Sequence, residues 1–323
     1  MENNTAENGL MRRRGAGSCI RTGYGLYADN FKSILKSSWI PALVYSLICA
    51  AIGALCVIYI PEMAVTTLRG GVSGTETTLL PQTMLAVLII AGGLVEIVFY
   101  SCGMSLLRSH KANGSIDKIR KRFYFDLRTA VRTLKITLAI IIVCAVSSAV
   151  LWVAYIYLLN SMGLETIELW KSLVIMSFFA VIVNIFMLPF IFPFMKYILN
   201  DNVKLADTLT SGYVTGLRRL HFILAVAFIT MCVTVAAGTI IQLPTIILAT
   251  ANAQSIYGTV YGDPLGMPDY MPVLTAATFF IAGFMQTYIR MSVLFPLYYA
   301  YGSTETFFKE KAESKKQRNT IEE

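Results

Sequence analysis

Six long apolar runs divide this chain, and they constrain its fold more than any other feature. They cover approximately residues 39–60, 84–107, 134–158, 172–199, 220–249 and 272–300. A helix rises about 1.5 Å per residue, so about 20 residues cross the roughly 30 Å of hydrocarbon in a bilayer. Lipid offers the backbone no hydrogen-bond partner, and the strands of membrane barrels are only about 10 residues long. The runs therefore predict an all-α membrane protein with six transmembrane helices.

The few charged residues are distributed unevenly along the chain. Only 14% of the 323 residues are charged, against about 25% in soluble domains. The connections that alternate along the chain differ sharply: 22 Lys and Arg fall in 1–38, 108–133, 200–219 and 301–323, but only two in 61–83, 159–171 and 250–271. Basic connections remain in the cytoplasm. The pattern thus predicts a multi-pass protein of the bacterial cytoplasmic (inner) membrane with both termini inside.

The net charge of +8 has a plain explanation in this setting. A basic cytoplasmic face attracts anionic lipid headgroups, so we expect the bilayer rather than nucleic acid as the partner. Protein partners and oligomeric state are not indicated. We expect a disordered cytoplasmic leader at 1–18, a six-helix transmembrane domain at 19–305 and a charged cytoplasmic tail at 306–323.

Three basic segments precede the outward-going spans, and each carries apolar residues three or four positions apart. They contain Tyr24, Tyr27, Phe31, Ile34 and Leu35; Phe123, Leu127, Val131 and Leu134; and Leu209, Tyr213 and Leu217. This spacing places the apolar residues on one helix face, as in amphipathic helices that lie in the headgroup layer. Such interfacial helices are expected before each pair of spans.

The returning spans also resemble one another. Phe192-Pro193 and Phe295-Pro296 lie near the ends of spans four and six, where span two has Cys102-Gly103. We therefore expect three similar hairpins, each with its own interfacial helix. The alternative is that any membrane hairpin with a basic flank shows part of this likeness.

Two ionisable residues lie deep inside the runs. Glu96 and Arg290 are each about 15–18 Å from the cytoplasmic edge, and ionisable groups at that depth indicate a functional site. Opposite charge at matching depth predicts that they pair. Gln286, one turn before Arg290, and Asn184 are further binding candidates. An ion pair that only fixes helix register is the alternative.

Prolines inside the runs predict kinks, because each removes a helix hydrogen bond. The expected kinks lie at Pro189, Pro193, Pro244 and Pro296. Pro41 instead falls in the expected first turn of its span, where proline is tolerated. The kinks are compatible with simple packing or with a gate.

No motif for catalysis is present. The sequence contains no GxSxG, Walker A or HExxH pattern, so no catalytic residue, no metal site and no cofactor is predicted. The most favoured role is a non-enzymatic transporter-like or accessory/scaffold component. The alternative is an intramembrane lipid-processing enzyme that uses cytoplasmic groups, namely Asp117, Asp126, Asp201, Asp207 or His110. A helix-capping role is expected for Asp207.

The aromatic segment from Phe31 to Trp39 and the two Phe-Pro pairs carry a loose resemblance. In architecture, residues 20–305 resemble six-span bacterial integral membrane proteins of unknown function and the membrane domain fused to some glycerophosphodiester phosphodiesterases. The catalytic barrel of those phosphodiesterases is absent from this sequence. The resemblance therefore implies the six-span architecture but no activity.

Overall fold

A computed structural model describes residues 9–68, 75–116, 126–161, 177–178, 181–183, 185–262 and 268–322. In these ranges all regular structure is helical. The helices are α2 (Ala16–Asp29), α3 (Phe31–Leu68), α4 (Thr75–Asn113), α5 (Leu127–Ser161), the 3-10 turn η1 (Leu188–Phe190), α7 (Ile191–Leu199), α8 (Leu205–Arg218), α9 (Leu220–Val260), α10 (Met271–Ser292) and α11 (Leu294–Glu322).

Six of the described helical stretches are long and apolar enough to cross a membrane. They are Phe31–Tyr59, Gln82–Asn113, Leu127–Val153, Val181–Leu199, Leu220–Ser255 and Met271–Thr320. Their apolar surfaces are largely exposed in the isolated chain, as expected of side chains that face lipid. The predicted all-α membrane class is confirmed, and each span coincides with one of the apolar runs.

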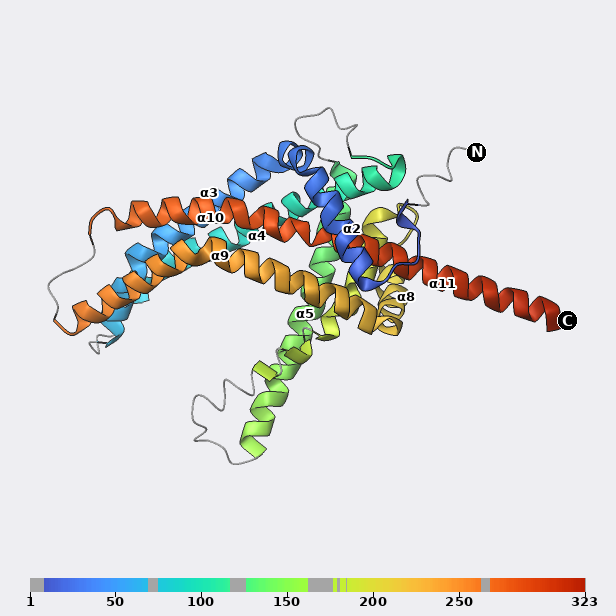
Figure 1. The fold of residues 1–323 in the computed structure, drawn as a ribbon. Coiled ribbons are helices and arrows are strands. Elements are labelled where there is room, and N and C mark those ends of the chain that lie inside the picture. The colour runs from blue at the N-terminus through green and yellow to red at the C-terminus, as the bar shows by residue number, and fades with distance from the viewer. Residues whose placement is uncertain are drawn as a thin grey trace.

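The spans form two arms that leave a common end of the molecule (Figure 1). One arm contains α3, α4, α9 and α10, and its most extensive contact is between α3 and α10. The other arm contains α5 and the helix that ends in α7, which contact each other. The first and third hairpins therefore pack together, whereas the second diverges from them.

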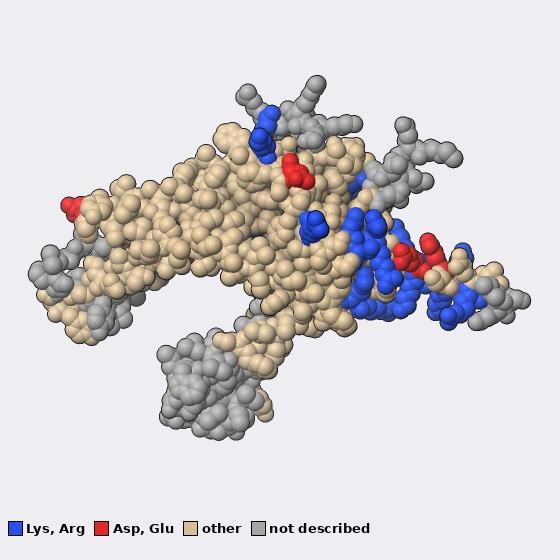
Figure 2. Space-filling view, viewed as in Figure 1, with Lys and Arg blue, Asp and Glu red and all other residues tan. Residues whose placement is uncertain are grey.

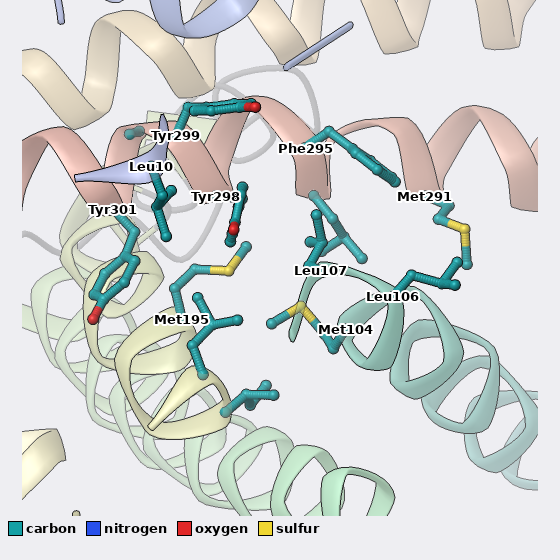
Figure 3. Packing of buried hydrophobic residues seen from close by; sticks show 14 of the residues in the cluster. Leu10, Met104, Leu106, Leu107, Met195, Met291, Phe295, Tyr298, Tyr299 and Tyr301 are labelled. Carbon is teal, nitrogen blue, oxygen red and sulfur yellow. The ribbon is translucent and has the colours of Figure 1, made fainter. Parts of the chain in front are cut away.

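The main buried core lies where the two arms meet. In Figure 3, Met104 and Leu107 of α4, Met195 of α7 and Tyr298 of α11 point toward one another. All four are fully buried. Lys and Arg side chains gather around α8 and α11 at this same end, while the arms on the face shown in Figure 2 are nearly free of charge. We call this the basic end.

Two short helices at the basic end have matching layouts. α2 and α8 each have 14 residues, with a Gly-Tyr pair at their eighth and ninth positions: Gly23-Tyr24 and Gly212-Tyr213. Each is separated from the following long helix by one residue. These residues, Asn30 (φ −108°, ψ 12°) and Arg219 (φ −120°, ψ 28°), have nearly the same backbone conformation. The first and third units, each a short helix followed by a hairpin, therefore match position by position at the short helix and at the residue that follows it.

The part of the second unit that is described lacks a separate short helix. Leu127, Val131 and Leu134 lie in the first turns of α5 itself, and Phe123 lies outside the described residues. Asp126 immediately precedes α5, and its carboxylate accepts hydrogen bonds from the backbone N–H groups of Arg128 and Thr129. This capping arrangement fixes the start of the long helix.

The prediction of a disordered leader is wrong for residues 9–18. Leu10 is fully buried, and α2 begins at Ala16. The backbone N–H of Arg14 donates to Ser303 Oγ at 3.0 Å, and that hydroxyl donates to the Arg14 carbonyl at 3.0 Å. Composition alone missed this segment, because its partner lies at the other end of the chain.

Two helix limits also differ from the prediction. α3 begins at Phe31, so Pro41 lies inside the helix and its predicted place in a first turn is wrong. At the other terminus α11 continues to Glu322, so the charged tail is helical through residue 322, with exposed side chains from 309 to 320.

Candidate functional site

The two deep charges lie side by side in the four-helix arm. Arg290 Nη1 of α10 is 3.1 Å from Glu96 Oε1 of α4. The same nitrogen lies 3.5 Å from the hydroxyl of Tyr45 in α3, at the limit of a hydrogen bond. Three helices from the first and third hairpins thus contribute to one polar cluster.

Small residues explain why α3 and α10 approach closely enough for this contact. A Cβ added to Gly283 would lie 3.0 Å from Cys49 Cβ, and one added to Gly53 would lie 2.6 Å from the ring of Phe279. Small residues at helix interfaces allow such approach in membranes. Gly283 precedes Arg290 by two helical turns, so the same face of α10 both packs on α3 and presents the arginine.

The ion pair is only partly buried within the isolated chain. The exposed fraction is 41% for the Arg290 side chain and 27% for the Glu96 side chain. At the depth of the hydrocarbon, an uncovered charge is expensive, and pairing reduces that cost. The geometry therefore supports mutual neutralisation and leaves one side of the pair accessible to lipid or to a partner.

The structure does not bring Gln286 to this pair. Its Nε2 would lie 2.9 Å from a Cβ added to Gly238 of α9. Gln286 therefore packs against α9, whereas Arg290 contacts α3 and α4. The Oε1 of Gln286 is buried and has no hydrogen-bond partner among the described residues. Sequence spacing placed Gln286 and Arg290 on one face, but two long side chains on that face can reach different neighbours. Asn184 lies outside the described residues.

The predicted proline kinks correspond to different local structures. Pro189 lies in the 3-10 turn η1 and Pro193 in the following α7. α10 ends at Ser292, four residues before Pro296. Proline has no N–H, so Pro296 cannot donate a hydrogen bond to the carbonyl of Ser292. α9 remains one helix through Pro244 and changes direction part-way along its length (Figure 1).

An apolar cavity of about 500 Å³ lies on another side of α10, where α2, α3 and α9 meet it. Its lining includes Tyr27, Phe31, Ile241, Phe284 and Ile289. Neither Glu96 nor Arg290 lines this cavity. The polar cluster and this cavity are therefore separate features.

Two of the acidic groups considered for headgroup chemistry, Asp126 and Asp201, are engaged in structural contacts. Arg108 forms a salt bridge with Asp201 and lies 3.9 Å from the carboxylate of Asp126. Partial burial raises the pKa of Asp126, but hydrogen bonds from Thr129 and the Arg128 backbone, together with Arg108, lower it overall. These contacts favour a structural role for the carboxylates of Asp126 and Asp201.

Two further enzyme candidates, His110 and Asp207, have other surroundings. His110 Nδ1 is 3.2 Å from the hydroxyl of Tyr298. Asp207 lies in the first turn of α8, but the N-cap is Lys204 and has no side-chain capping bond, so the expected capping role is wrong. The Asp207 charge instead faces a favourable helix N-terminal dipole. Asp117 lies outside the described residues.

Sequence reasoning missed a structural arginine in the second hairpin. Arg132 of α5 donates to the carbonyls of Tyr197 and Asn200, at 2.6 Å each, and to the Asp201 carbonyl at 3.1 Å. Its guanidinium also lies 4.1 Å from the centre of the Tyr197 ring. The available signal was an arginine interleaved with the apolar residues of a basic segment, which could reach the open carbonyls where a helix ends.

No family description, curated protein or solved structure matches this chain. The loose resemblance to six-span membrane proteins therefore remains a prediction.

Proposed function

We propose that this chain is a non-enzymatic accessory or scaffold component of the bacterial cytoplasmic membrane. One observation carries the proposal: the Glu96–Arg290 ion pair joins the first hairpin directly to the third. In this role the ion pair holds the helices of one arm together, which we call the fastening role. The basic end, with both described terminal segments, α2 and α11, faces the cytoplasm in this proposal, in keeping with the positive-inside rule.

The two-armed shape supports a scaffold role. Figure 2 shows open space between the arms, and α5 exposes large apolar side chains along its length, including Ile142, Val150 and Val153. In a bilayer this space is filled by lipid or by the helices of a partner. α2 and α8 lie at the headgroup layer in this arrangement, with their basic residues toward water.

A transporter is the second candidate, favoured by the partial exposure of Arg290 and Glu96. A charged pair that can be reached from outside the bundle is able to bind an ion or a polar solute. The separation of Gln286 from the pair weighs against the three-residue site on which the transporter hypothesis was based. A lipid-processing enzyme is supported less, since Arg108 engages both Asp126 and Asp201.

Exchange of the two charges tests the scaffold proposal. We expect Glu96→Arg and Arg290→Glu each to lower the thermal stability of the detergent-purified protein, and the double exchange to restore much of it. The neutral double variant, Glu96→Gln with Arg290→Gln, should be more stable than either single Gln variant, because no unpaired charge remains. Glu310→Lys, on the exposed part of α11, is the matched charge-reversal control.

Flux measurements distinguish the two roles. Wild-type protein in liposomes that contain a pH-sensitive dye should move no more protons than empty liposomes do. A wild-type proton flux that Arg290→Gln abolishes without loss of stability would establish transport and refute the scaffold proposal. Failure of the double exchange and of the neutral double variant to recover stability would refute the fastening role.

A further inference from the structure

A basic groove of about 650 Å³ lies where the two helices of the second hairpin meet at the basic end. Three of its side chains come from the first turns of α5: Arg128, Arg132 and Lys135. The other wall is formed by Tyr197, Asp201 and Asn202, at and beyond the end of α7, and Leu127 and Val131 complete the lining. The spacing of four and three residues places the three cations on one helix face.

The groove has an excess of positive charge. Arg132 is held by backbone carbonyls, which are neutral, so its charge is not cancelled. The one acid in the lining, Asp201, is paired with Arg108 outside the groove. Arg128 and Lys135 are exposed, and no described carboxylate forms a salt bridge with either. The groove therefore presents an uncompensated cationic surface to an anion.

The surface next to the groove is apolar and continues along α5. Leu138, Ile142 and Val146 follow Lys135 at helical spacing, and their exposed fractions are 45%, 62% and 59%. They belong to the candidate span Leu127–Val153. Cations followed by an exposed apolar stripe match a molecule with an anionic head and hydrocarbon chains, whereas a free anion uses only the groove.

We propose that this groove binds the phosphate of an anionic glycerophospholipid, whose acyl chains lie along the exposed face of α5. Arg128 and Lys135 provide the charge that is free to pair with the phosphate. Arg132 fixes the wall that carries Tyr197 and adds a third positive charge. This site lies in the second hairpin, and it does not depend on the role of Glu96 and Arg290.

Lipid titration of the full-length chain in detergent tests the proposal. Phosphatidylglycerol should raise the unfolding temperature at concentrations where phosphatidylcholine does not. For Arg128→Gln with Lys135→Gln, we expect the apparent affinity for phosphatidylglycerol to fall about tenfold or more, since each cation near an anionic headgroup contributes a several-fold factor. Lys315→Gln with Lys316→Gln removes the same charge from the exposed part of α11 and should leave the affinity unchanged.

Additional ligands identify the source of the phosphate, and an additional variant controls for misfolding. Inorganic phosphate and glycerophosphoglycerol, which lack acyl chains, should neither stabilise the protein nor compete with the lipid. Arg128→Lys with Lys135→Arg should keep the affinity, and it shows that the site tolerates substitution. The proposal would be overturned if the two double Gln variants lost the same affinity for phosphatidylglycerol, or if the wild type bound phosphatidylglycerol and phosphatidylcholine equally. It would also be overturned if inorganic phosphate stabilised the protein in a way that needs Arg128 and Lys135.

Discussion

Gly23 of α2 lies directly against the backbone of Pro296 in α11: a Cβ on Gly23 would stand 2.6 Å from the Pro296 Cα. Gly212, at the same position of α8, has the same relation to Pro193, where the added Cβ would lie 2.9 Å from the Pro193 Cβ. Each contact joins a Gly-Tyr pair to a Phe-Pro pair. The short helix of the third unit thus docks on the second unit, and that of the first docks on the third.

The first prediction concerns this close approach. Gly23→Ala should destabilise the protein by about 1–3 kcal/mol, because the methyl group would overlap backbone atoms that cannot move aside. Gly25→Ala, on the same helix with no atom within 4 Å of its added Cβ, should be neutral or slightly stabilising, because alanine favours helix. Thermal unfolding of the purified variants measures both. Equal midpoints for the two variants would refute the packing argument.

The second prediction concerns Arg132. Arg132→Lys should lower stability by about 1–3 kcal/mol, since one ammonium group cannot donate at once to the carbonyls of Tyr197, Asn200 and Asp201. Arg128→Lys is the matched control, because Arg128 is exposed on the same helix and its side chain makes no such bonds among the described residues. Denaturation curves of the two variants should separate clearly. A tolerated Arg132→Lys would contradict the carbonyl-binding role.

The third prediction is a pH dependence at Asp126. Its pKa is lowered in the folded chain, so the ionised carboxylate adds stability above the unfolded pKa of about 3.9. That contribution is lost as the pH falls through the folded pKa. Asp126→Asn should therefore be less stable than wild type at pH 7, and the difference should narrow below about pH 4. Glu310→Gln, on exposed α11, should show no such convergence in the same pH series.

The fourth prediction concerns the thiol of Cys19. Burial raises its pKa to about 11, although Arg14 and Arg219 act in the opposite direction. Since the thiolate is the reactive form, Cys19 should resist maleimide at neutral pH until the protein is unfolded. The control carries Ser18→Cys with Cys19→Ala, which moves the thiol to an exposed neighbour. Rapid modification of native Cys19 would show that α2 does not remain docked.

The membrane class and the pairing of Glu96 with Arg290 could be predicted from the sequence. Hydrocarbon thickness fixes the length of a span, and the cost of a charge in lipid makes Glu96 and Arg290 natural partners. The likeness of the short segments was also visible in composition. Their exact register required the structure, since apolar spacing does not show where Asn30 or Arg219 interrupts the helix.

Contacts between distant segments could not be predicted. Nothing local indicates that Leu10 is buried, because its neighbour Gly302 is near the other end of the chain. Whether Gln286 contacts α9 or the Glu96–Arg290 pair depends on how α10 is rotated and on the space that Gly238 leaves on α9. The basic groove was also missed, because its second wall begins 62 positions after Lys135, at Tyr197. In each case the missing information was the packing of helices around one another.

The docking of the N-terminal segment sets an order for biosynthesis. Arg14 and Ser303 are 289 positions apart, and at about 5–20 residues per second a ribosome needs roughly 15–60 s to make that stretch. α2 is therefore among the first helices to emerge, yet its binding surface on α11 is among the last to be made. During this interval α2 has no α11 to dock on, and the last hairpin completes the assembly of the first.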